Sequence, residues 1–293
     1  MDELAIRLII NSGSALWHAL CGLLIPAVVF AALGAIVKGR GAIKDARKAL
    51  PETRVNLLII AFNIVLLAPF LALFSTWMSE TFQTSNLQLI SAYKWQWLPT
   101  PIVIFAAVFV GDFAGYWRHR LEHTKLLWPS HAVHHSDTQM TWLSLERFHP
   151  VNRLTTMAID SAVLLLIGFP AYAVVANNLV RHYYGYFIHA DLPWTYGKLG
   201  SVFVSPVMHR WHHAADENAY NTNFATVFSV FDRCHGTFRV PGPCRTSLGV
   251  TEHMGFGFVR QLLYPFRPSA YRRSTGGMPP RASQLRIPFR DTE

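Results

Sequence analysis

The sequence has little cysteine and little charge, and both shortages narrow the class of protein. Only three cysteines occur in 293 residues. Cys21 lies in an apolar run, and Cys234 and Cys244 lack the spacing of metal ligands, so neither a disulfide framework nor a zinc finger is indicated. Charged residues make up 15% of the chain and hydrophobic residues 51%. This composition is too apolar for an ordinary soluble domain and favours a membrane protein.

The signatures of several common protein classes are also missing. The chain has no phosphate-binding glycine loop, no nucleophile elbow and no internal repeat beyond a doubled histidine motif. Basic residues outnumber acidic ones, 26 to 17, which gives a formal net charge of +9. Because these basic residues flank apolar runs, we expect them to orient the chain in a membrane and do not expect nucleic acid binding.

Three apolar runs have about the length needed to cross a bilayer: residues 15–37, 55–78 and 99–116. Six basic residues lie between the first two runs, in residues 38–54, whereas residues 79–98 carry one acidic and one basic residue. The positive-inside rule therefore places 38–54 in the cytoplasm and 79–98 outside. The third run then brings the histidines that follow it to the cytoplasmic side.

A fourth apolar stretch, residues 156–189, is interrupted near its middle by Gly168-Phe169-Pro170. Pro170 removes a backbone donor and disfavours helix in the residue before it. A single crossing would put the last histidine cluster across the membrane from the earlier ones. We therefore predict a helical hairpin that returns His189 to the cytoplasmic side.

The expected fold is an all-α integral membrane protein with about three spanning helices, a helical hairpin and a cytoplasmic, histidine-rich helical cap. We expect residues 1–266 to form a single membrane-embedded domain whose histidine motifs lie within residues 100–240. Residues 267–293 are rich in Pro, Gly, Ser and Arg, and we expect a basic, mobile tail. It either lies on anionic lipid or has no role.

Histidine is clustered in three places along the chain. The clusters are His119 and His123, then His131, His134 and His135, then His209, His212 and His213. Residues three or four apart share one face of a helix, so each cluster presents several imidazoles in one direction. A lone histidine is usually structural, but clustered imidazoles are typical ligands of Zn, Cu, Fe and Ni. Eight imidazoles are too many for one tetrahedral zinc, so the clusters predict two metal ions.

Carboxylates near the clusters are candidates for orienting the histidine rings. Asp112 lies on the same helical stripe as His119 and His123. It could accept the second ring N–H of one of them, or it could be a buried polar group bonded to another helix. Glu122 and Asp232 are weaker candidates for the same orienting role.

Five segments in order resemble the fatty acid hydroxylase / sterol desaturase superfamily: DFAGYWRHRLEH, HAVHHS, RFHP, HRWHH and NTNFATVFSVFDRCHGTF. The resemblance covers roughly residues 100–240. It implies a dimetal centre, taken to be di-iron, at the cytosolic face of a small helical membrane bundle. It also implies that O2 and electrons are used to hydroxylate or desaturate lipid C–H bonds.

Carried over by position, the resemblance implies nine ligands. They are His119, His123, His131, His134, His135, His189, His209, His212 and His213. His189 rests on FIHADLPW, which resembles the single-histidine segment of the family, and His182 is a reserve candidate seven residues earlier. His149 fits the RFHP segment, and we interpret it as structural or as a partner of a ligand.

We predict a membrane-bound lipid oxidoreductase, most simply a hydroxylase of a lipid or sterol-like C–H bond. A desaturase with the same centre is the nearest alternative. A zinc-dependent membrane hydrolase or a non-catalytic metal-binding protein would belong to a different class. A hydrolase would use a carboxylate base, as in His-Glu-x-x-His, and that pattern is absent. Zinc binds the same ligands as iron, so the ligands alone do not identify the metal.

The expected cofactors are two Fe ions, with O2 as co-substrate, and the expected substrate is a membrane lipid. Since no cytochrome-b5-like domain is fused to the chain, we expect electrons from a separate electron-donor protein. The expected location is a multi-pass position in a membrane, with the metal site on the cytoplasmic side. A bacterial inner membrane is favoured, with the endoplasmic reticulum as the alternative.

Overall fold

The structure is a computed structural model that describes residues 3–251, 254–255 and 257–271. In this part of the chain every regular element is a helix, apart from two isolated β-bridges that join Phe203 to Phe228 and Ala214 to Leu248. The prediction of an all-α fold is therefore confirmed. Most of the expected basic tail, residues 272–293, lies outside the described residues.

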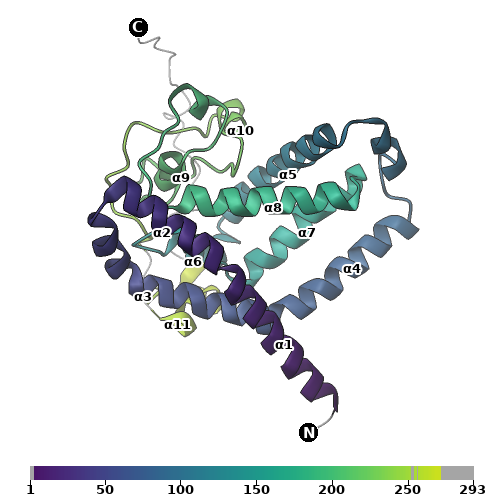
Figure 1. Cartoon of the computed structure of the whole chain (residues 1–293), viewed down its shortest axis with the longest axis horizontal. Helices are drawn as coiled ribbons and strands as arrows, with labels where there is room; N and C mark the ends of the chain where they lie inside the picture. Colours follow the sequence, from purple (N-terminus) through teal and green to yellow (C-terminus); the bar gives the residue numbers. More distant parts are fainter. Residues whose placement is uncertain (1–2, 252–253, 256, 272–293) are drawn as a thin grey trace.

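Seven long helices build the apolar base of the molecule (Figure 1). They are α1 (Glu3–Gly22), α2 (Leu24–Lys38), α3 (Gly41–Phe62), α4 (Ala68–Thr84), α5 (Thr100–Glu122), α7 (Pro150–Ile167) and α8 (Ala171–His189). Four stretches are long and apolar enough to cross a membrane: Gly13–Lys38, Gly41–Thr84, Thr100–Glu122 and Pro150–Ile167. The chain is a multi-pass membrane protein. The first two predicted runs lie within two of these stretches, and the third begins one residue before Thr100–Glu122.

The second stretch, from α3 to α4, is longer than the apolar run that predicts it. It covers 44 residues, about 66 Å of helix and roughly twice the hydrocarbon thickness of a bilayer. The basic segment 38–54 is mostly the first half of α3 rather than a connection. A π-helical turn, η1 (Asn63–Leu67), joins the two halves, and the Asn63 side chain donates to the Phe148 carbonyl (2.9 Å). Such turns are common causes of helix bends.

The predicted hairpin is present as α7 and α8, which both pack against α5 (Figure 1). Gly168 ends α7 in the left-handed region, with φ 79°. A Cβ at this position would lie 1.8 Å from the Ile90 carbonyl oxygen, so the turn needs glycine for space as well as for conformation. Of the two hairpin helices, only α7 has the length and apolarity of a span.

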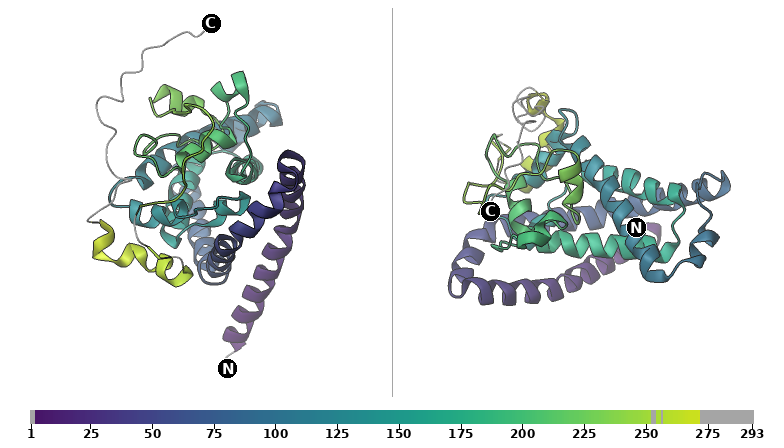
Figure 2. Two further views of the ribbon diagram at one scale, coloured as in Figure 1. Left: turned by 90° about the vertical axis from the view of Figure 1, so that its left-hand side faces the viewer. Right: turned by 90° about the horizontal axis from the view of Figure 1, so that it is seen from above.

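A cap of short helices and loops covers one end of the base. It contains α6 (Trp128–His135), α9 (Pro206–His212), α10 (Val230–Cys234) and α11 (Phe258–Leu262), with 3-10 turns at Trp142–Glu146, Gly197–Ser201, Tyr264–Phe266 and Pro268–Tyr271. A further 3-10 turn, Ala92–Trp97, lies outside the cap. Tyr116 of α5 packs in one cluster with Met208, Phe224 and Phe228 of the cap. Ala270, in the first residues of the predicted tail, is buried against the cap. Figure 2 shows α1 and α2 as a long, curved rod along one side of the molecule.

The connecting segments lie at two opposite ends of the base (Figure 1). Residues 38–54 contact the cap, where Lys38 pairs with Asp191 and Glu52 pairs with Arg147. Residues 79–98 lie at the hairpin turn instead, where Trp95 stacks on Phe169 with ring centroids 4.5 Å apart. This relative arrangement agrees with the predicted topology. The assignment of the cap to the cytoplasm stays a prediction.

We expect labelling of single cysteines to establish the side of the membrane. In a background without the three native cysteines, Ser85→Cys should react with an impermeant maleimide in intact cells. Glu217→Cys, on an exposed cap loop, should react only after lysis, because a cytoplasmic cap is shielded by the membrane. Reaction of Glu217→Cys in intact cells would contradict the predicted orientation.

Candidate metal centre

Nine histidines from four parts of the chain meet where the cap covers the base. They are His119 and His123 at the end of α5, His131, His134 and His135 on α6, His189 at the end of α8, and His209, His212 and His213 on or next to α9. All nine are buried. The chain thus brings together the full set of histidines that the resemblance implies.

The nine rings form two groups, each with ligand atoms within 4.8 Å of one another. The five-histidine group consists of His119, His123, His131, His135 and His212. The four-histidine group consists of His134, His189, His209 and His213. The rings of His135 and His213 stack across the two groups, with centroids 4.4 Å apart. The two groups are therefore neighbours in one centre, as the prediction of two metal ions requires.

The Nε2 atoms in each group converge. Neighbouring Nε2 atoms lie 2.9–3.2 Å apart, along the pairs 119–131, 119–212 and 131–135 in one group and 134–189, 189–209 and 209–213 in the other. For a metal ion about 2.1 Å from each nitrogen, two ligands at a right angle lie about 3 Å apart. The spacing thus fits two ions bound through Nε2.

The pair of His119 and His212 gives the clearest test of this fit. The Nδ1–H of each ring donates to a backbone carbonyl, of Phe224 and of Thr222 respectively, at 2.7 Å. When both rings are neutral, neither Nε2 carries a proton. Their lone pairs nevertheless face each other at 3.0 Å. Two such lone pairs repel, so this arrangement calls for a cation between them.

The histidines of the cap are held in the neutral form that binds metals. Burial is the main cause that lowers the pKa of His131, His134, His135, His209 and His213 well below the ordinary value. Burial also lowers the pKa of His212, to about 4. Since metal ions compete with protons for imidazole nitrogen, rings that stay neutral at pH 7 are available as ligands.

Backbone carbonyls fix several of the rings from behind. Besides His119 and His212, His189 donates from Nδ1 to the Gly185 carbonyl at 2.7 Å. His123 donates from Nδ1 to the Asn221 side chain at 3.3 Å. Each bond fixes the tautomer and directs Nε2 into the centre. The carbonyl partners could not be predicted, because a backbone carbonyl leaves no signal in the sequence.

Of the two roles left open for Asp112, the structure favours the buried polar group: its carboxylate lies 3.5 Å from Arg181 of α8 and holds a loop instead of a histidine ring. It accepts from the backbone N–H groups of Thr226, Val227 and Phe228 at 2.8–3.2 Å. Asp232 supports His119 indirectly. Its carboxylate accepts hydrogen bonds from the backbone N–H groups of Phe224 at 2.7 Å and of Ala225 at 2.9 Å. It thereby fixes the carbonyl that receives the His119 N–H.

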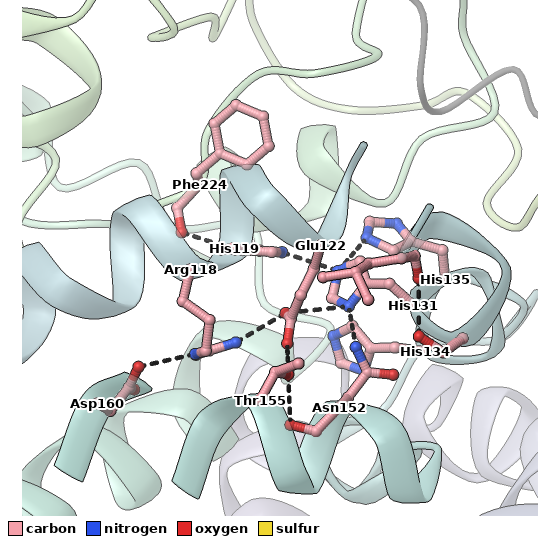
Figure 3. A network of polar contacts seen from close by, with 12 residues as sticks. Arg118, His119, Glu122, His131, His134, His135, Asn152, Thr155, Asp160 and Phe224 are labelled. Carbon is pink, nitrogen blue, oxygen red and sulfur yellow. Dashed lines mark hydrogen bonds and ion pairs between the residues drawn. The ribbon is translucent and has the colours of Figure 1, made fainter. Parts of the chain in front are cut away.

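Glu122, the weaker candidate, does contact a ring. Its Oε2 lies 3.4 Å from Nδ1 of His131, on the side of the ring that faces away from the centre. Arg118 donates to the same carboxylate oxygen at 2.7 Å, and Thr155 donates to the other oxygen (Figure 3). Asn152 faces His131 Nδ1 as well, at 3.2 Å, and was not expected from the sequence.

These contacts belong to a chain of buried charges that crosses three helices. Arg118 also binds Asp160 on α7 at 2.8 Å, and Asp160 binds Arg181 on α8 at 2.8 Å. Arg181 lies 3.5 Å from Asp112. This row of residues holds three carboxylates and two guanidinium groups. Its end at Glu122 touches the five-histidine group, where a carboxylate favours a bound cation.

Two further predicted histidines lie outside both groups. His149 caps the start of α7: its Nδ1 accepts from Val151 N and its Nε2 donates to the Leu262 carbonyl at 3.0 Å. These contacts fit the structural role, one of the two roles that we expected. His182, the reserve candidate, is 42% exposed and lies 3.6 Å from Glu146. His189, and not His182, lies in the four-histidine group.

A cavity of about 760 Å³ lies between α2, α3 and the cap. Its wall on α2 is apolar and includes Ala27, Phe30 and Ala31. Its wall on the cap includes Ala190 and Arg210, which directly follow His189 and His209 in the chain. The cavity therefore extends from a membrane-spanning helix to residues that adjoin His189 and His209 in the chain.

Fold and site together define a multi-pass helical membrane protein with a histidine-rich candidate dimetal centre. The model of the fatty acid hydroxylase family matches residues 104–237, a range that contains all nine histidines. This match confirms the resemblance seen in the sequence: over these residues the chain is similar to the fatty acid hydroxylase / sterol desaturase superfamily.

Relatives with known names are lipid-modifying enzymes. The chain is 31% identical to the ornithine lipid hydroxylase OlsE of Rhizobium tropici over 186 residues, which cover 63% of this chain and 56% of that protein. It is 30% identical to the alkylglycerol monooxygenase of Danio rerio over 193 residues, 64% of this chain and 40% of that protein. It is 27% identical to the Delta(7)-sterol 5(6)-desaturase ERG3A of Gibberella zeae over 131 residues.

The similarity spans only about half the length of these relatives or less. No solved structure matches the chain significantly.

Proposed function

We propose that this chain is a membrane-bound, O2-dependent oxidoreductase that hydroxylates a C–H bond of a lipid. Two iron ions held by the nine histidines would serve as its cofactor. The observation that carries the proposal is the convergence of nine buried imidazoles on two centres beside a partly apolar cavity. Imidazole ligands suit iron. The named relatives include a lipid hydroxylase, a monooxygenase and a desaturase, which supports oxidation rather than hydrolysis.

In this proposal the five-histidine group holds one ion and the four-histidine group holds the other. Bound iron supplies the oxidation of the C–H bond by O2. The chain's own residues set the conditions for that chemistry. Backbone carbonyls fix the rings of His119, His189 and His212, Glu122 fixes His131, and burial keeps water away from the centre.

In this proposal a lipid enters from the bilayer through the cavity. Its apolar wall belongs to the stretch Gly13–Lys38, which is long and apolar enough to span a membrane. Phe30 of this wall stacks on Trp142 of the cap, with ring centroids 5.6 Å apart. A lipid chain could therefore pass from the bilayer into the cavity without crossing water.

Desaturation of a lipid is the second candidate function. It begins with the same abstraction of a hydrogen atom, and one relative is named a sterol desaturase. A zinc hydrolase fits less well. It would need a carboxylate beside an open metal position, whereas Glu122 lies behind His131 and is bound to Arg118 and Thr155.

The same proposal includes an electron donor, the side of the membrane on which the cap lies, and the type of membrane. We propose that electrons come from a separate redox protein and that the cap faces the cytoplasm. The basic segment 38–54 lies at the cap end of the molecule, where the positive-inside rule expects it. We propose a bacterial inner membrane, with the endoplasmic reticulum as the alternative; the named relatives come from a bacterium, a fish and a fungus.

Isotope labelling tests this function. Cells that produce the wild-type chain under 18O2 should accumulate a lipid that is heavier by one labelled oxygen, and cells that produce His134→Ala should not. High-resolution mass spectrometry of the lipid extract measures both. A product that has lost two hydrogens would instead identify a desaturase. Oxygen derived from water would overturn the oxygenase and restore the hydrolase.

A further inference from the structure

The cavity beside the four-histidine group has a charged end as well as an apolar wall. Lys38 at the end of α2, Asp45 on α3, and Asp191 and Arg210 on the cap all line it. Lys38 binds Asp45 at 3.0 Å and also Asp191, and Arg210 binds Asp191 at 2.8 Å. We call these four residues the charged quartet. It contains two cations and two anions.

The quartet is poorly explained as a means of stabilising the fold. Its side chains are 21–47% exposed, and ion pairs with that exposure contribute little to stability. They also keep unused bonding capacity. Lys38 has three donors and Arg210 has five, and the carboxylates of Asp45 and Asp191 can accept further bonds. The quartet can therefore bind a charged group without leaving a buried charge unpaired.

The balance of charges indicates what kind of group would bind. A purely anionic headgroup would be attracted by Lys38 and Arg210 but repelled by the two carboxylates. An uncharged headgroup would gain little from any of the four. A headgroup that carries both signs could pair its cation with Asp45 and Asp191 and its anion with Lys38 and Arg210.

We propose that the cavity binds one lipid with a zwitterionic headgroup, held by the charged quartet, with its hydrocarbon chain along the apolar wall of α2. Asp191 lies two residues after His189, and Arg210 directly follows His209. The bound lipid thus lies next to the four-histidine group. This inference rests on the proposed function, because it names the class of lipid that the same centre would oxidise.

Direct binding tests the inference without any turnover. The purified full chain in detergent is titrated with short-chain phosphatidylcholine, which is zwitterionic, with phosphatidylglycerol of the same chain length, which is anionic, and with the matching diacylglycerol. Bound lipid is counted by native mass spectrometry. We expect phosphatidylcholine to bind about tenfold more tightly than either of the others, a difference of about 1.4 kcal/mol.

Three variants complete the test. Asp45→Lys should shift the preference to phosphatidylglycerol, and Ala31→Trp should reduce binding of all three lipids by filling the apolar part of the cavity. Lys48→Gln removes an exposed charge of α3 that does not line the cavity, so it should behave as wild type. Equal binding of the three lipids, or a wild-type preference for phosphatidylglycerol, would overturn the proposal.

Failure of this inference can be told apart from failure of the proposed function. A chain that binds phosphatidylcholine selectively but incorporates no 18O into lipid supports the binding site and contradicts the oxygenase. A chain that incorporates 18O but shows no preference among headgroups supports the oxygenase and contradicts the quartet as a headgroup site.

Discussion

His135→Ala and His213→Ala are expected to abolish activity and to lower the metal content of the purified chain below two ions. Each variant removes one ring from one of the two groups. Loss of a residue that merely supports a ligand typically lowers metal affinity or activity 10- to 100-fold, so loss of the ligand should exceed about 100-fold. Elemental analysis of anaerobically purified protein and a lipid oxidation assay give the two measurements.

Two matched histidines serve as controls for this experiment. His18 is exposed on α1 and bonds to Ser14 of its own helix. His182 lies beside Glu146, outside both groups. Neither His18→Ala nor His182→Ala should change the metal content. If the His135 and His213 variants stay fully active, or if His182→Ala loses metal, the assignment of the two groups is wrong.

Arg118→Met is expected to lower the stability of the chain by about 3–5 kcal/mol, the usual loss when one partner is removed from a buried ion pair. The substitution keeps most of the side-chain volume but leaves Glu122 without its guanidinium partner and Asp160 with one partner fewer. Glu122 is fully buried and Asp160 is 5% exposed, so water cannot replace the lost bonds.

Thermal unfolding in a single detergent measures this loss. Lys125→Met is the control, because Lys125 is an exposed cation three residues after Glu122. Its melting temperature should match that of the wild type. If Arg118→Met melts at the same temperature as Lys125→Met, the buried chain of charges does not stabilise the three helices.

Much of the fold could be predicted because its signals are local. Apolar length marks the spans, and the break at Gly168-Phe169-Pro170 marks the hairpin. The helical period also predicts that His119 and His123 face the same way, and both belong to the five-histidine group. The continuation of α3 into the basic segment could not be predicted, because basic residues indicate the side of the membrane and not the residue at which a helix begins.

The division of the histidines into two groups could not be predicted. His134 and His135 are neighbours on α6, so they point in directions about 100° apart on the helix. Which ring meets which partner depends on where α8 and α9 lie, and the sequence does not encode that locally. The role of Asp112 stayed open for a related reason. Its stripe on α5 was correct, but the partner on that side is the loop at Thr226–Phe228.

The partners in the chain of buried charges also depend on the packing of distant helices. Asp160 could be expected to face the interior of the bundle, because a carboxylate at membrane depth needs a partner. Its partners, Arg118 and Arg181, come from two other helices. Only the packing of α7 and α8 on α5 brings them together. Thus the need for a partner was predictable, and its identity was not.

The position of His134 and His135 on one short helix has a mechanical consequence. His134 belongs to the four-histidine group and His135 to the five-histidine group. Consecutive Cα atoms are about 3.8 Å apart and joined by a rigid peptide plane. The separation of the two groups is thus limited by one peptide unit of fixed length as well as by the packing of distant helices. A shift of α6 would therefore move imidazoles of both groups at the same time.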